Sequence, residues 1–578
     1  MKKINTILSA IAAVLALASC EGALELKNPN NQTTYDFGDS ESELQEAVIA
    51  CYNRIRLEGT FARVGYTMDA VRGDEVWNSS QVWYLPYDNL NSVNTDEIGN
   101  QWIWRDCYHV VNRCNFVLSK VDGASLSDDA YNEIKGQALF LRALAYYELA
   151  TYQQDVPLFV DYSQYSSMET MYTSNSTQDE VFDQIEEDLE EAMRILPSRD
   201  KGGEWAKGRA TCGAAAGYYA RALMFRHKYA EAYDVLKDII AGKYGHYDLV
   251  KDYGDNFRED TENNVESLFE VQFMDYGTGG TDDEWTPVNI SSNASQGHAV
   301  ESNCGPAAFG SWADLAVSPW LYDLFKAERC TDGTLDPRLY WTLASYEPEY
   351  DSYTGAKTAA YPDGDPRCNV VYQTVITENP VSNTANGGIA IAKFTNARNN
   401  LYSTIEVGLK CGVNLRLMRY SDVLLRAAEC ENEINGPTQT AIDYINLVRN
   451  RVALPDLKLA DFPSADALFE QIANVERPKE FGCENGRGID IIRWGFFYDE
   501  GRLQQLKEHG SYTRGTGEGA TEDSSFNYYE KGHEYFPIAQ STLNANPKLS
   551  GNSANNNTDN GEVFRSKWSI HPVVKLNK

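Results

Sequence analysis

Histidine is scarce in this chain of 578 residues, and the short motifs of common catalytic sites are missing. The seven histidines include no H-E-x-x-H segment, which excludes the zinc-binding helix of the zincin proteases. No two cysteines form a C-x-x-C pair, which excludes a zinc ribbon and a thioredoxin-type motif. No G-x-S-x-G segment is present, so a serine-hydrolase elbow is unsupported. We therefore predict no catalytic residue, no metal site and no cofactor.

Positive charge is also in short supply. The chain has 51 Lys and Arg against 84 Asp and Glu, and its formal net charge is −33. A surface this acidic repels phosphate backbones, so we expect no nucleic-acid partner. The same excess of acids always offers carboxylate pairs, so a glycoside hydrolase stays open as an alternative.

Long apolar runs are absent after the first twenty residues. Lys2 and Lys3 precede an apolar segment, Ile7 to Ala18, that is too short to span a bilayer. Small residues then lead into Cys20 in the order Leu-Ala-Ser-Cys, which is typical of a bacterial lipoprotein signal. We predict a signal peptide over 1–19, lipidation of Cys20, and a polar tether over 20–40 that holds the protein to the membrane through its lipid alone. An ordinary signal peptide with a chance cysteine is the alternative.

Ten cysteines remain after Cys20. Most of them lie in apolar helical patterns and are interpreted as buried thiols. Cys304, Cys330 and Cys368 lie in loop-rich sequence and could pair in an oxidising compartment.

Helical patterns dominate both flanks of the chain. Thr177-x-x-Glu180 predicts a capping box, an apolar stripe follows it, and Pro197 ends that helix. The segment from Ile134 to Ala150 is apolar on several faces, so we expect a helix that is buried nearly all round.

Two further segments resemble tetratricopeptide helix pairs. They are 214–225 with the helix that starts near Lys228, and 420–434 with 441–452. Alanines at such seams let two helices approach closely, and stacked pairs bury a continuous core. We predict a mostly α fold in which these pairs form a scaffold over about 41–250 and 416–500.

The middle of the chain has a different character. From about 252 to 415 turn residues dominate, and short β-like runs such as Leu268 to Phe273 and Ile389 to Phe394 interrupt them. We predict a long loop-rich insertion with minor β structure, inside a single body that spans 41–578. Loops on a rigid scaffold are where binding sites usually lie.

Ordered landmarks along the chain resemble the SusD/RagB family. They are Trp104-x-x-x-Tyr108 with Asn112 and Asn115; Gln137 to Tyr147 with Asp155 to Leu158; Gly208 to Thr211; Arg419 to Leu425 with Ala428-Glu429; Asn446-x-Val448-Arg449-x-Arg451; Glu476-Arg477 with Gly486-Arg487 and Arg493 to Gly495; and Tyr535 to Ile538 with Asn546-Pro547. The tail from Gly551 to Lys578 continues past the family's usual end.

The resemblance implies a function and a partner. Such a protein is expected to be a surface lipoprotein of the outer membrane that captures oligosaccharide or polysaccharide and acts as a lid over a SusC-like TonB-dependent transporter. Some members bind peptides, which is one alternative; a pure protein-binding scaffold and a tethered hydrolase are others. Arg142 and Arg487 belong to the landmarks, and we interpret them as partners in ion pairs between helices.

The ligand-binding residues are expected in the loops. Sugar recognition needs an aromatic face for the ring and polar groups for the hydroxyls. The first cluster with both is Asp74, Trp77, Asn78 and Trp83, in a polar segment with no periodic neighbours to bury it. From the insertion, Trp285 and Trp312 are the predicted facing wall.

Overall fold

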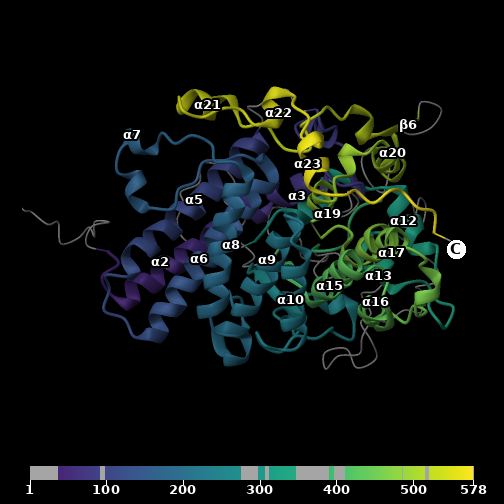
Figure 1. The fold of residues 1–578 in the computed structure, drawn as a ribbon, viewed down its shortest axis with the longest axis horizontal. Coiled ribbons are helices and arrows are strands. Elements are labelled where there is room, and N and C mark those ends of the chain that lie inside the picture. Colours follow the sequence, from purple (N-terminus) through teal and green to yellow (C-terminus); the bar gives the residue numbers. More distant parts are fainter. Residues whose placement is uncertain are drawn as a thin grey trace, which may run out of the picture.

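The computed structural model describes residues 37–91, 98–274, 297–305, 311–345, 389–395, 411–484, 486–514 and 520–576. Within these residues helices predominate, and the strands form three separate two-stranded sheets. The prediction of a mostly α fold is confirmed. Figure 1 shows the longer helices side by side, with the chain's C-terminal segments lying across one edge of this array.

Four long helices build the first half of the scaffold. They are α2 (Glu41–Arg54), α5 (Ile98–Val121), α6 (Asp128–Gln153) and α8 (Gln178–Ile195). Helix α6 packs between α5 and α8, which explains why it is buried on nearly every face as predicted. Arg142 on α6 donates two hydrogen bonds of 2.7 Å to the carboxylate of Asp188 on α8, so the predicted ion pair between helices is confirmed.

The start of α8 shows how local sequence fixes a helix boundary. The Thr177 hydroxyl accepts from the backbone N–H of Glu180, and the Glu180 carboxylate accepts from the backbone N–H of Thr177. This reciprocal capping box satisfies two amide groups that the helix itself cannot pair. The helix ends before Pro197, as the sequence predicts.

Two helix hairpins continue the array. Helix α9 (Cys212–Phe225) packs on α10 (Tyr229–Ile240), and α15 (Tyr420–Asn435) packs on α16 (Gln439–Arg451). Both predicted pairs are therefore confirmed. Helix α10 also contacts α15, so the two hairpins are neighbours in space although the insertion separates them in sequence. Three fully buried alanines, Ala214, Ala215 and Ala216, permit the close approach at α9.

Shorter helices fill the space around this scaffold. They are α3 (Val64–Ala70), α4 (Leu85–Asp88), α7 (Met168–Met171), α11 (Val300–Cys304), α12 (Pro319–Lys326), α13 (Pro337–Thr342), α17 (Ala465–Gln471), α18 (Arg477–Phe481), α19 (Arg487–Arg493), α20 (Glu500–His509), α21 (Gln540–Ala545), α22 (Ser553–Asn556) and α23 (Gly561–Lys567). Two π-helical turns, η1 (Glu58–Ala62) and η11 (Ile472–Glu476), also occur, and several short 3-10 turns connect other elements, among them η12 (Phe496–Tyr498).

All three sheets are antiparallel pairs. Strand β1 (Val76–Asn78) pairs with β3 (Leu315–Val317), β2 (Ser267–Val271) with β4 (Leu415–Arg419), and β5 (Ser511–Arg514) with β6 (Thr521–Ser524). The β-like run predicted at Leu268 to Phe273 corresponds to β2. Around Ile389 the chain makes only isolated bridges, to Val317 and, from Ile391, to Leu343.

Buried ion pairs tie the described part of the insertion to the scaffold. The Arg338 guanidinium lies 3.3 Å from Glu480, and the Lys393 ammonium lies 2.8 Å from Glu484. Arg419, at the end of β4, donates to both of these glutamates. All five side chains are almost completely buried, so removing one partner would leave an uncompensated charge in the interior. These contacts hold the described part of the insertion against the scaffold.

One hydrophobic cluster runs from Leu44 to Phe564, which supports a single body from α2 to α23.

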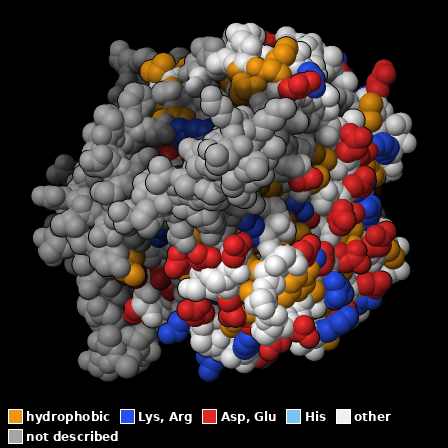
Figure 2. Space-filling view, turned by 90° about the vertical axis from the view of Figure 1, so that its left-hand side faces the viewer, with side chains coloured by type: hydrophobic (Ala, Val, Ile, Leu, Met, Phe, Trp, Pro, Cys, Tyr) orange, Lys and Arg blue, Asp and Glu red, His pale blue; other side chains and the backbone are white. Residues whose placement is uncertain are grey.

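Nine cysteines lie in the described residues, and all are buried free thiols, Cys304 and Cys330 included; Cys368 lies outside the described residues. Across the described part of the chain, no helix combines the length and apolar character needed to cross a bilayer. On the face shown in Figure 2, Asp and Glu side chains are spread widely, with Lys and Arg between them.

Candidate glycan-binding site

Three side chains from distant parts of the chain form a stack at the surface. The guanidinium carbon of Arg63 lies 4.9 Å from the ring centroid of Trp312 and 5.6 Å from that of Trp83. Arg63 is 4% exposed, whereas Trp312 is 41% exposed and Trp83 is half-buried. A cation on an aromatic face holds the ring in place electrostatically. We call Arg63, Ser80, Trp83, Trp312 and Asp314 the Trp312 site.

The insertion places Trp312 through backbone hydrogen bonds. The Trp312 N–H donates to the Ser302 carbonyl at 2.6 Å, and the Asp314 N–H donates to the Asn303 carbonyl at 2.6 Å. Between them Ala313 has a φ of +52°, a left-handed conformation that non-glycine residues rarely adopt. This local strain turns the chain so that the ring of Trp312 faces outward while Asp314 faces inward.

The register of β1 with β3 brings the segment with Trp83 beside the segment with Trp312. Asn78 pairs with Leu315, and the next residue, Ser79, donates from its N–H to the Asp314 carbonyl and from its hydroxyl to the Ala313 carbonyl. The Asn78 side chain then forms a turn by accepting from the Gln81 N–H at 3.0 Å and donating to the Gln81 carbonyl at 2.7 Å. Because of this turn, Trp83 emerges next to the insertion.

Beneath its ring, Trp83 rests on a rigid support. Its ring lies 3.8 Å, centroid to centroid, from Tyr84, which is completely buried. The Tyr84 hydroxyl accepts hydrogen bonds from Thr67 and from the Asn303 side chain. Tyr84 therefore links α3, the Trp83 segment and the insertion. It holds the ring of Trp83 in place without a bound ligand.

Asp314 supplies a polar group beside the rings. One carboxylate oxygen accepts from the exposed Ser80 hydroxyl at 2.9 Å, and the other has no hydrogen-bond partner among the residues that the structure describes. Burial raises the pKa of Asp314 to about 6, with Ser80 and Arg63 opposing the shift. A buried acceptor without a partner is costly, so an additional hydrogen-bond donor at this oxygen would be stabilising.

The other residues predicted in the first cluster do not lie open to solvent. Asp74 is completely buried and accepts from Arg487 at 2.7 and 2.9 Å and from His509 at 2.9 Å. Burial opposes its ionisation, but Arg487 and His509 outweigh that effect and hold the pKa of Asp74 below its ordinary value. Arg487 thus makes a structural ion pair as predicted, but it joins α19 to the bend before β1 and not to another helix. Asn78 is also buried and serves the turn described above.

Trp77 corrects the expectation that nothing buries this segment. It is 3% exposed, and its ring stacks on Tyr512 of β5 at a centroid distance of 4.0 Å and an angle of 4°. The strands that cover Trp77, β3 and β5, lie more than two hundred residues further along the chain. The periodicity of the residues around Trp77 therefore could not predict its burial. Trp285 lies outside the described residues.

Sequence reasoning missed Arg63 as a site residue. Arg63 follows the π-helical turn η1, and no pattern in the sequence distinguishes it from other arginines. Sequence reasoning could have selected Asp314, which lies two residues after Trp312. An acid beside an aromatic residue was the reason for selecting Asp74 and Trp77.

Comparison with known proteins agrees with this arrangement of helices and loops. Residues 265–555 match the family model described as the SusD family, and residues 23–224 match one described as starch-binding associating with outer membrane. The first match alone covers half of the chain. The protein belongs to the SusD family. The resemblance drawn from the sequence landmarks is confirmed.

Several SusD-like proteins are similar to this chain over most of their length and most of its own. The SusD-like protein P25 of Formosa agariphila is 23% identical, with 96% of this chain and 99% of the relative covered. A SusD-like protein of Bacteroides ovatus is 22% identical, with 94% and 93% covered. The fold is similar to that of a SusD superfamily protein from Bacteroides vulgatus, with a TM-score of 0.71 at 23% identity over 90% of this chain and 100% of that one. Surface glycan-binding protein A of Bacteroides thetaiotaomicron, solved in complex with laminarihexaose, has a TM-score of 0.65 at 22% identity over 89% and 99%.

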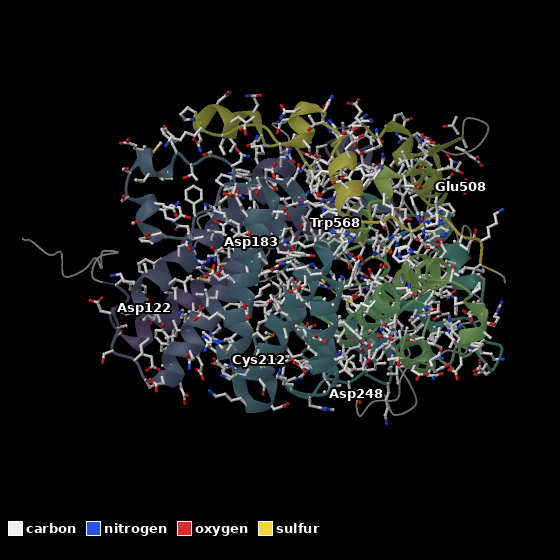
Figure 3. The ribbon with its side chains drawn as sticks, viewed as in Figure 1. Asp122, Asp183, Cys212, Asp248, Glu508 and Trp568 are labelled. Carbon is white, nitrogen blue, oxygen red and sulfur yellow. The ribbon has the colours of Figure 1, made fainter. Side chains whose placement is uncertain are left out.

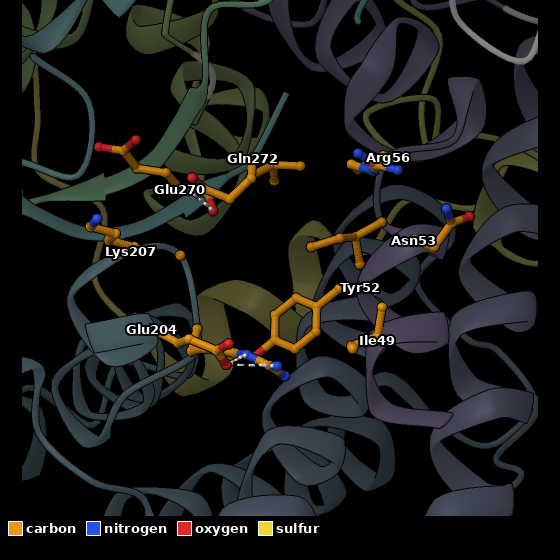
Figure 4. A pocket seen from close by; sticks show the side chains of 12 residues that line it. Ile49, Tyr52, Asn53, Arg56, Glu204, Lys207, Glu270 and Gln272 are labelled. Carbon is orange, nitrogen blue, oxygen red and sulfur yellow. Dashed lines mark hydrogen bonds and ion pairs between the residues drawn. The ribbon is translucent and has the colours of Figure 1, made fainter. Parts of the chain in front are cut away.

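A separate cavity of about 380 Å³ lies between α2, the segment 204–209 and β2 (Figure 4). Tyr52 and Ile49 form its apolar wall, and sequence reasoning selected neither. Its two acids already have partners: Glu204 lies 3.0 Å from Arg209, and Glu270 lies 3.2 Å from Arg416. Unlike Asp314 at the Trp312 site, both acids of this cavity are therefore paired with arginines of the protein itself.

The described residues of this SusD protein form no cluster of potential metal ligands. Across those residues no three His, Cys, Asp or Glu side chains come together in a way that could hold an ion. The shifted carboxyl groups described above, Asp74 and Asp314, are explained by burial and by neighbouring cations, so their pKa values give no reason to assign a catalytic role.

Proposed function

We propose that this SusD family protein binds oligosaccharide or polysaccharide at the Trp312 site. One observation carries the proposal: a tryptophan with two-fifths of its surface open is held face-on by a buried arginine, beside a buried carboxylate with one oxygen to which no described residue donates. The ring suits the C–H face of a sugar, and the carboxylate suits its hydroxyls. The laminarihexaose complex of a protein with the same fold supports this choice of ligand class.

The direct test is affinity electrophoresis of the soluble protein through gels that contain one polysaccharide each, with laminarin and starch in the panel. We expect at least one polysaccharide to slow the wild-type protein, and Trp312→Ala to restore its mobility. Retardation by none of the polysaccharides, with binding to a peptide library instead, would overturn the glycan proposal in favour of a peptide ligand.

We further propose that binding is not followed by catalysis in this protein. Purified protein incubated with the polysaccharide that retards it should release no new reducing ends. Product release that is lost on changing one carboxylate pair would replace the binding function with that of a hydrolase.

We also propose the anchor and partner that the family resemblance implies. Cys20, which lies outside the described residues, would carry the lipid that holds the protein at the outer membrane, with the body facing the cell exterior. A SusC-like TonB-dependent transporter would receive the ligand. A tagged form should co-purify with such a barrel from detergent-solubilised outer membranes, and recovery of the tagged protein alone would contradict the partnership.

A further inference from the structure

A second cavity, of about 370 Å³, lies beneath the C-terminal helix α23. Its walls come from the end of α6, the start of α8, the end of α9 and α23 itself. Trp568, which follows α23 and is labelled in Figure 3, forms part of its lining. It shares no residue with the Trp312 site. We call it the Trp568 cavity; a volume of several hundred cubic ångströms suits a small ligand.

Aromatic rings make up much of this lining. Phe182 and Phe225 stack on each other with centroids 4.7 Å apart and an angle of 12°. Tyr498, Tyr535 and Phe564 also line the cavity, together with the half-buried Trp568. Several flat apolar faces around one space are the surroundings that the C–H faces of a sugar ring require.

Two residues of the lining each leave one buried amide atom without a hydrogen-bond partner in the described part of the chain. They are the side-chain oxygen of Gln154, an acceptor, and the side-chain nitrogen of Asn560, a donor. Such orphaned groups are uncommon in folded proteins because each costs free energy. A hydroxyl both donates and accepts, so a ligand with several hydroxyls could satisfy both groups after a rotation of their terminal torsions, which are soft.

Gln154 is also held in a strained backbone conformation. It follows α6 with φ of 65° and ψ of −94°, close to the rare γ-turn that strains any residue with a side chain. A glycine would relieve that strain, yet the position carries a long polar side chain. Strain of this kind is often found where a side chain must point at a ligand.

The tail that covers the cavity is fastened to the body. The Lys567 ammonium lies 2.8 Å from the Asp179 carboxylate, and the Trp568 ring stacks on His227 with centroids 4.5 Å apart. Further on, the Arg502 guanidinium donates to the carbonyls of His571 and Pro572. The wall that α23 provides is therefore a fixed part of the structure.

We propose that the Trp568 cavity is a second binding site, for a single sugar residue or the end of a glycan chain. It takes the same class of ligand as the proposed function, but it does not depend on the Trp312 site. Aromatic side chains line it together with the two residues that carry the unpaired amide atoms, and the C-terminal tail completes it. A protein with two such sites would hold a long glycan at two places and gain avidity without new contacts at either.

Saturation-transfer NMR with the methyl glycosides of glucose, galactose, mannose, xylose and N-acetylglucosamine tests this. Val563, on α23, lines the mouth and is 58% exposed, so Val563→Trp should fill the entrance without disturbing the core. Glu562→Trp is the matched control, on the same helix and exposed but outside the lining. All variants carry Trp312→Ala as well, so that the Trp312 site contributes no transfer; in that background we expect at least one glycoside to receive saturation from the parent protein and from Glu562→Trp, and none from Val563→Trp. Transfer that survives equally in both variants, or that never occurs, would overturn the proposal.

Two further variants separate this site from the Trp312 site. Trp312→Ala should keep the transfer that Val563→Trp abolishes; the reverse pattern would leave the proposed function standing and remove the second site. Gln154→Gly should unfold at a higher temperature, because strain and an orphaned carbonyl are lost, yet bind the glycoside about fivefold more weakly, as expected for one lost hydrogen bond. Unchanged binding in Gln154→Gly would overturn the role assigned to Gln154.

Discussion

Replacing Trp312 by alanine should separate binding from stability. The ring is 41% exposed, and the contact that holds it is the stack on the Arg63 guanidinium. A stacking platform contributes roughly 1–3 kcal/mol to binding, by analogy with other aromatic platforms. We therefore expect Trp312→Ala to weaken glycan binding at least about tenfold, or ~1.4 kcal/mol.

The effect of the same change on folding should be small. An exposed cation–π contact is worth about 0.5–1 kcal/mol, and the ring fills no interior space. In a protein of this size we expect the melting temperature to fall by about 2 °C or less. Trp312→Phe, which keeps a flat ring, should restore most of the affinity.

Trp77→Ala is the matched comparison, because Trp77 lies on β1, which pairs with the strand that follows Trp312. This ring is 3% exposed and stacked on Tyr512, so its removal opens a cavity and should cost about 3–5 kcal/mol of stability. Isothermal titration with the polysaccharide or its oligomers, and calorimetric unfolding of each variant, measure both quantities. Equal affinity in wild type and Trp312→Ala would refute the reasoning, as would a Trp77→Ala variant that loses affinity while its melting temperature stays unchanged.

The remaining predictions concern the anchor and two titrating groups. Cys20→Ala should leave a folded protein that fractionates away from membranes in cells without the transporter; retention there would contradict lipid anchoring. Burial raises the pKa of Glu75 to about 8, so above pH 4.5 the folded state holds a proton that the unfolded state has lost. The free energy of unfolding should therefore fall as the pH rises from about 5 to 8, by up to ~1.4 kcal/mol per pH unit. Chemical denaturation of Glu75→Gln should show a weaker decline over the same range. Burial works against the charge of His571, but its contacts with Glu433 at 2.7 Å and Asp466 at 2.6 Å outweigh it and raise its pKa. These contacts should therefore hold the C-terminal tail most firmly below about pH 6.5 and weaken as the pH rises through the raised pKa of His571. Amide hydrogen exchange of residues 568–576 should become faster over that pH range in the wild type, and it should not change with pH in this way in His571→Gln.

The local sequence determined most of the scaffold, because helix boundaries depend on neighbouring residues. Thr177 and Glu180 form their cap within four residues, and the apolar faces of 134–150 could be read before any partner was known. The landmark segments likewise identified the family, and one of them carries Arg142, which pairs with Asp188 of the neighbouring helix α8.

The site was decided by tertiary structure. Trp77 and Trp83 are six residues apart in one polar segment, yet β3 and β5 bury the first while the second reaches the surface beside Trp312. The pairing of residues 76–78 with 315–317 brings the two halves of the Trp312 site together, and Arg63 joins them from a third segment. Exposure of a side chain depends on what packs over it, and that partner can come from anywhere in the chain, so a local pattern could propose these aromatics but could not say which one faces solvent.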